Sequence, residues 1–127
     1  VRAAVSDCAF TSAWDVFCAV LKNMYHLPAF PIMQIANRMV KKQAGYELDE
    51  CNAREEVAKT EIPVLFIHGD ADTFVPCSMV HELYEACQSE KKLVIIKGAG
   101  HVESCYKDPE EYEEAVCSFI FPIMERK

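Results

Sequence analysis

The sequence predicts an α/β protein in which buried parallel strands alternate with helices. Two short runs, Ile62–Ile67 and Leu93–Ile96, are apolar and rich in β-branched residues, as is typical of strands covered on both faces. Between them, apolar residues recur every three or four positions, as along one face of a helix. A strand, a helix and a second strand of this kind make a βαβ unit, whose two strands run parallel.

The first half of the chain is predicted to add one strand and two helices. Val1–Val5 is mostly apolar and indicates a third buried strand. Helical spacing then marks two segments, Ser12–Met24 and Ile32–Gly45, the first opened by a serine that can cap it and the second closed by a glycine. The polar stretch that follows suggests a connector with a short helix near Asn52–Lys59. A final helix is predicted from Pro109, followed by glutamates that suit a helix N-terminus.

Composition and charge limit the classes of function. The 127 residues are 51% hydrophobic and 26% charged, which indicates one folded domain. The formal net charge of -7 argues against nucleic acid as a partner, because phosphate backbones are bound by Lys and Arg. No apolar run reaches the length of a membrane span, so no membrane partner is expected. The chain begins with Val1 rather than Met, and we expect its natural start to lie upstream, where a signal peptide could be encoded.

The seven cysteines indicate packing rather than metal binding. They are odd in number, include no C-x-x-C pair and have no regular spacing, so they resemble buried, reduced thiols. Reduced thiols favour the cytoplasm as the location.

Two loops carry the chemistry. One, 68–76, follows the Ile62–Ile67 strand, and the other, 98–101, follows the Leu93–Ile96 strand. Because the carboxyl ends of parallel strands meet at one edge of the sheet, Asp72 and His101 are expected to lie close together. A carboxylate that orients an imidazole is the pair that activates a serine in hydrolases.

The residues of these two loops also allow structural, metal-binding and Cys-His interpretations. Asp70 or Asp72 could bind backbone N–H groups in a turn, and with His68 they could be imagined as a metal site. Cys105 lies four residues after His101 and could form a Cys-His pair, but two such groups on one loop rarely face each other. No metal and no cofactor are expected.

The loops resemble those of a known family. The segment from Pro63 to Pro76 has the pattern H-G-x-x-D-x-x-V-P and is similar to the acid-bearing segment of α/β-hydrolases of the prolyl-oligopeptidase and acyl-esterase kind. The run G-A-G-H ending at His101 resembles their histidine loop. The resemblance implies the C-terminal part of an α/β-hydrolase fold: residues 1–11 as a core strand and loop, 12–45 as a helical lid, and 46–127 as the core with parallel strands and flanking helices.

The resemblance also implies a function. Asp72 and His101 match the acid and base of a Ser-His-Asp triad that cleaves an ester, thioester or peptide bond of a small-molecule or peptide acyl substrate. The nucleophile elbow G-x-S-x-G occurs nowhere in the 127 residues, so this chain alone is expected to be inactive. We expect the missing N-terminal half, or a second copy, to cover the Val1–Val5 edge. The alternative is a non-catalytic fragment that serves as an interaction or structural module.

Overall fold

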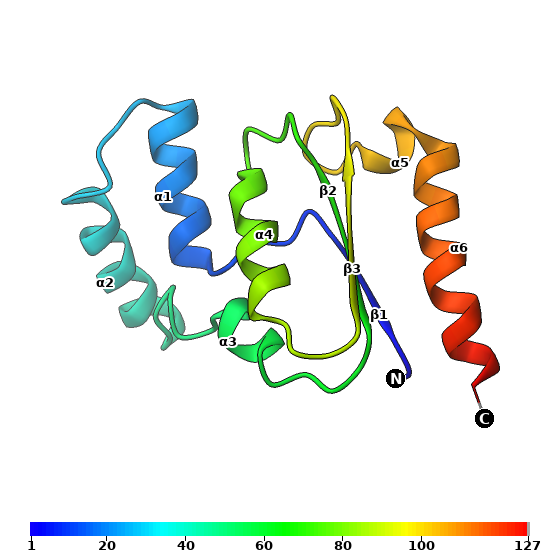
Figure 1. Ribbon diagram of the computed structural model, residues 1–127. Coiled ribbons are helices and arrows are strands. Elements are labelled where there is room, and N and C mark those ends of the chain that lie inside the picture. Colours follow the sequence, from blue (N-terminus) through cyan, green and yellow to red (C-terminus); the bar gives the residue numbers. More distant parts are fainter. Residues whose placement is uncertain (127) are drawn as a thin grey trace.

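The fold is a three-stranded parallel sheet with helices on both faces. The structure is a computed structural model that describes residues 1–126. The strands β1 (Ala4–Asp7), β2 (Val64–Gly69) and β3 (Lys91–Ile96) lie in the order β1-β2-β3, with β2 in the centre (Figure 1). Both pairings are parallel. The predicted α/β class with parallel strands and flanking helices is confirmed.

The alternation of side chains along β2 divides the core into two layers. Leu65 and Ile67 pack with Phe119 and Ile123 of α6 (Pro109–Glu125) on one face. The residues that alternate with them, Val64 and Phe66, pack with Val80 and Leu83 of α4 (Cys77–Ala86) on the other face. All six residues of β2 are buried, which explains why this strand is an uninterrupted apolar run in the sequence.

Two helices from the first half of the chain extend the molecule on the α4 side. The helices α1 (Ala13–Met24) and α2 (Ile32–Ala44) lie beyond α4 in Figure 1, and the short α3 (Ala53–Val57) leads into β2. The short α5 (Ser104–Lys107) precedes α6. The Ser12 side chain accepts a hydrogen bond from the N–H of Asp15, and Gly45 ends α2 in the left-handed conformation. Both predicted helix ends are therefore confirmed.

The strands differ from their predicted ranges by two or three residues. The first begins at Ala4 rather than Val1, since its pairing with β2 begins at Ala4, and the guanidinium group of Arg2 donates to the carbonyls of Ile123 and Met124 at the end of α6. The second continues through Gly69, which was predicted to be in a turn, because β3 pairs with it as far as Ile96. Ladder partners set these limits, and partners cannot be read from local composition.

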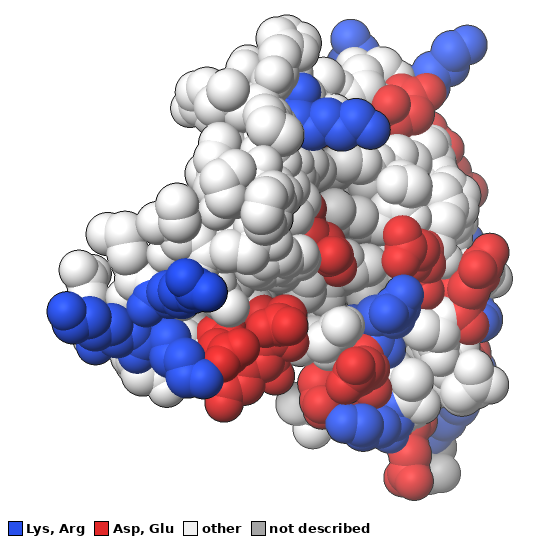
Figure 2. Space-filling model, turned by 90° about the vertical axis from the view of Figure 1, so that its left-hand side faces the viewer, with Lys and Arg blue, Asp and Glu red and all other residues white. Residues whose placement is uncertain are grey.

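The α1–α2 segment carries a large uncharged surface. An open apolar groove of about 380 Å³ lies between the two helices, lined by residues such as Phe17, Val20 and Met33. Figure 2 views the molecule from this side and shows a mostly uncharged surface, with basic side chains gathered beside acidic ones at its lower edge. Val16 of α1 packs against Val75 and Met79, so the segment is anchored on the loop that follows β2. Its role as a lid stays a prediction.

Within residues 1–126, no helix has both the length and the apolar character required to cross a membrane.

Candidate active site

Two loops leave the carboxyl ends of β2 and β3 and are joined by hydrogen bonds. The N–H of Ala71 donates to the carbonyl of Ala99 at 3.0 Å, and the N–H of Gly98 donates to the Asp70 carboxylate at 2.6 Å. The approach is close: a Cβ atom on Gly69 would lie 2.1 Å from the Ala99 carbonyl oxygen. Only glycine fits this crossing, so the H-G pair of the motif has a packing reason.

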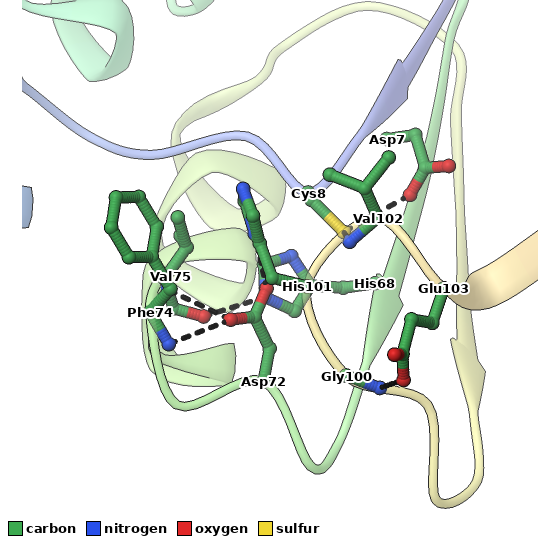
Figure 3. A network of polar contacts seen from close by, with 10 residues as sticks. All are labelled: Asp7, Cys8, His68, Asp72, Phe74, Val75, Gly100, His101, Val102 and Glu103. Carbon is green, nitrogen blue, oxygen red and sulfur yellow. Dashed lines mark hydrogen bonds and ion pairs between the residues drawn. The ribbon is translucent and has the colours of Figure 1, made fainter.

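The loops bring Asp72 and His101 together. The distance from Nδ1 of His101 to Oδ2 of Asp72 is 2.8 Å, across 29 positions of sequence (Figure 3). The Asp72 side chain is fully buried, whereas the His101 side chain is 36% exposed. Because the carboxylate accepts a hydrogen bond from Nδ1–H, the neutral imidazole keeps its lone pair at Nε2.

The second oxygen of Asp72 is held by the backbone of its own loop. Oδ1 accepts hydrogen bonds from the N–H groups of Phe74 and Val75, at 2.9 and 2.8 Å. Two backbone donors fix the rotation of the carboxylate before any substrate is present. The ring of Phe74 also lies against the imidazole of His101, with 4.9 Å between ring centroids, so one short loop positions both members of the pair.

A second histidine, His68, contacts the acid loop from the buried side. Nε2 of His68 donates to the carbonyl of Val75 at 2.9 Å and lies 3.5 Å from Oδ2 of Asp72. The His68 side chain is completely buried. Both neighbours of Nε2 are acceptors, so this nitrogen carries the proton. Among the described residues, Nδ1 has no hydrogen-bond partner.

Cys8 is a third group at this edge, and the sequence analysis did not single it out. It follows β1, and its Sγ lies within 4.8 Å of ligand atoms of Asp72 and His101. Its S–H donates to the carboxylate of Asp7 at 3.2 Å, and the N–H of Val102 donates to its sulfur at 3.3 Å. The rule that places strand ends at one edge applies to β1 as well, and that signal was available from the sequence.

Two other candidates from the sequence, Asp70 and Cys105, are not part of this cluster. The Asp70 carboxylate binds the backbone of Gly98, so the imagined His68, Asp70 and Asp72 metal trio does not form among the described residues. Cys105 is solvent-exposed, as is Cys51, so the prediction of buried thiols is wrong for these two cysteines and right for Cys8 and Cys87. Exposed thiols escape a pattern argument that rests on the apolar character of neighbouring residues.

Comparison with protein families identifies the group to which the site belongs. Residues 16–102, more than half of the chain, match the family described as Serine hydrolase (FSH1). The chain belongs to this serine hydrolase family. The matched range contains both loops and ends one residue after His101.

Curated relatives of this chain are themselves described as uncharacterized. The protein YqkD of Bacillus subtilis is 32% identical over 116 residues, which are 91% of this chain and 38% of that protein. YfhR of Escherichia coli K12 is 33% identical over 93 residues, covering 71% of this chain and 32% of the relative. The chain thus spans well under half the length of the relatives it matches.

Solved structures share the fold of this chain. The Pyrococcus furiosus esterase PF2001 superposes with a TM-score of 0.67 at 22% identity, covering 94% of this chain and 44% of that one. Acetyl xylan esterase 1 from Thermoanaerobacterium gives a TM-score of 0.65 at 20% identity, covering 97% and 38%. These similarities confirm the α/β-hydrolase fold predicted from the two loops.

Proposed function

We propose that this chain supplies the acid and the base of a catalytic triad that hydrolyses an ester, thioester or peptide bond. The observation that carries the proposal is the 2.8 Å contact between a buried Asp72 carboxylate and a partly exposed His101 imidazole. Membership of a serine hydrolase family supports the same chemistry. Asp72 and His101 are the two residues to which we assign catalytic roles.

The proton path follows from the ring nitrogens. Nδ1 of His101 donates to Asp72, so Nε2 is the free base that takes the proton from a serine hydroxyl as its oxygen attacks the substrate carbonyl. The imidazolium that forms is stabilised by the carboxylate and then passes the proton to the leaving group. Acylation and hydrolysis of the acyl-enzyme use the same two residues, and neither step needs a cofactor.

The serine itself is proposed to come from a segment encoded upstream of Val1. The 127 residues contain no G-x-S-x-G, and the edge of β1 that faces away from β2 pairs with no other strand among the described residues. A strand that precedes a nucleophile elbow would pair there and extend the parallel sheet. Its serine would then stand at the same edge as His101. The cytoplasmic location expected from the cysteines stays a prediction.

The test uses the product of the complete coding sequence. We expect it to hydrolyse p-nitrophenyl acyl esters and to be labelled by a fluorophosphonate on a serine outside residues 1–127. His101→Ala should lower kcat/KM by about a thousandfold or more, because the serine loses its general base. His81→Ala is the matched control, since His81 is exposed on α4 and is expected to leave turnover unchanged.

The outcomes also separate this proposal from a non-catalytic module. A complete coding product without a G-x-S-x-G, without ester hydrolysis and without fluorophosphonate labelling would contradict the enzyme and favour an interaction role. Equal activity of the His101→Ala and His81→Ala proteins would remove His101 from the mechanism even if the protein is a hydrolase.

A further inference from the structure

Cys8, Asp72 and His101 form a cluster that the triad chemistry does not explain. One potential ligand atom of each residue, a thiol sulfur, a carboxylate oxygen and a ring nitrogen, lies within 4.8 Å of the other two. Hydrolysis needs only the last two. The thiol comes from a separate strand end, 64 positions before Asp72 in the sequence, so local folding of the acid loop does not account for its place (Figure 3).

The backbone holds the sulfur at this point under strain. Cys8 and Val102 both adopt left-handed backbone conformations, with φ of 53° and 59°. Such values are unfavourable for residues with a side chain, above all for β-branched valine. The N–H of Val102 nevertheless donates to the sulfur. The backbone thus fixes the position of the sulfur beside Asp72 and His101 before any metal is bound.

We propose that Cys8, Asp72 and His101 bind Zn²⁺ and that the bound ion inhibits the hydrolase. Sulfur, nitrogen and carboxylate oxygen are the donors that zinc takes in proteins, whereas Ca²⁺ and Mg²⁺ prefer oxygen alone. Zinc bonds of about 2.0–2.3 Å hold tetrahedral ligand atoms about 3.3–3.8 Å apart, so ligand atoms that lie up to 4.8 Å apart must approach by no more than about 1.5 Å. The exposed face of His101 leaves the fourth position to water.

Binding exchanges a proton for a metal–sulfur bond. Burial raises the pKa of Cys8 to about 11, so the metal-free protein carries the neutral thiol. When zinc binds, the sulfur–hydrogen bond is replaced by a zinc–sulfur bond, and the proton leaves by way of Asp7, which already accepts it in a hydrogen bond. Asp7 and Asp72 both face the thiol, and their negative charge favours the cation.

The ion and the catalytic proton compete for the same atoms. Zinc bound at Nδ1 of His101 replaces the hydrogen bond to Asp72, and zinc bound at Nε2 occupies the proton acceptor. Either arrangement stops general-base catalysis. This inhibition rests on the proposed function, whereas the metal site itself does not.

The metal site is tested spectroscopically in the complete coding product. Co²⁺, which substitutes for zinc, should give the near-ultraviolet charge-transfer band of a sulfur–cobalt bond, and Zn²⁺ should displace it. Cys8→Ser should abolish the band and weaken zinc binding by at least about tenfold, since even the loss of an outer-shell partner costs that much. Cys105→Ser is the matched control, because Cys105 is exposed and outside the cluster.

His101→Ala provides a second variant should Cys8→Ser unfold, and it is also expected to weaken cobalt binding. In the activity assay, zinc should inhibit the unsubstituted protein, and the ratio of activity with zinc to activity without it should stay near one for Cys8→Ser. A cobalt band that survives in Cys8→Ser, or that disappears in Cys105→Ser, would overturn the proposal. Absence of any ester hydrolysis would contradict the proposed function alone, because the cobalt spectrum is read without substrate.

Discussion

Both oxygens of the Asp72 carboxylate are held by hydrogen-bond donors around them. Its two oxygens face the N–H groups of Phe74 and Val75 and the rings of His101 and His68. A carboxylate with this many donors is locked in orientation. The geometry of the acid is therefore built into the loop and does not depend on the arrival of a substrate.

These hydrogen bonds predict the effect of Asp72→Asn. The amide is isosteric, but its NH2 group must face either two backbone donors or the imidazole, so one set of hydrogen bonds is lost. We expect kcat/KM in the complete coding product to fall by about 10³–10⁴ and the free energy of unfolding to fall by about 1–3 kcal/mol. Ester hydrolysis and urea unfolding measure the two effects.

Asp70→Asn is the control for that substitution. Asp70 lies on the same loop but is exposed, and an amide oxygen can still accept from Gly98. It should keep most of the activity and stability. Equal losses in the two variants would mean that position 72 acts through the loop and not through the imidazole.

Single residues were predictable where a motif or a strand end marks them. Asp72 and His101 could be expected to meet, because each follows a recognisable strand and adjacent parallel strands share an edge. Cys8 was missed because its approach to Val102 joins positions 94 apart and depends on a left-handed backbone turn. Cysteine is common in cores, so its composition signal favoured packing.

At the scale of elements, a close backbone approach holds the acid loop (68–76) against the histidine loop (98–101). Gly69 ends β2 directly beside the Ala99 carbonyl, and the N–H of Ala71 donates to that same oxygen. A shift of either loop would move Asp72 relative to His101. Backbone contacts thus fix the position of the acid loop relative to the histidine loop.

Gly69→Ala should disrupt this approach. The added Cβ would lie 2.1 Å from a backbone oxygen, so one loop must move, at a cost of about 3 kcal/mol in the free energy of unfolding and with loss of activity. Gly45→Ala is the comparison: its site is open, and only the positive φ of 82° is unfavourable, which costs about 1 kcal/mol. Urea unfolding and ester hydrolysis distinguish them, and equal loss of activity in both would contradict a role for the crossing.

Helix limits followed from the sequence more closely than strand limits. A capping serine, a terminal glycine and a first-turn proline act within a few residues, so α1, α2 and α6 begin or end where those residues stand. The limits of β1 and β2 depend on partners elsewhere in the chain. The short α5 was missed, because four residues carry no helical periodicity.

For the whole molecule, the two outer strands are proposed to differ. If an upstream strand pairs with β1, its outward N–H groups are hydrogen-bonded in the complete coding product, whereas the outward N–H groups of β3 pair with no strand among residues 1–126. Hydrogen exchange should therefore be slow along all of β1 and should alternate between slow and fast along β3. Alternating rates in both strands would contradict an upstream strand beside β1.

The hydrogen bonds that join the two loops also bear on how such a protein can diversify. The acid and the base stand within one continuous stretch of 30 residues, 72 to 101, and are aligned by contacts internal to that stretch and the strand before it. A genetic exchange that carries residues 64 to 101 intact would transfer the proposed acid–base pair in one piece. The helices upstream are then free to change which molecules reach this pair, with no need to rediscover its alignment.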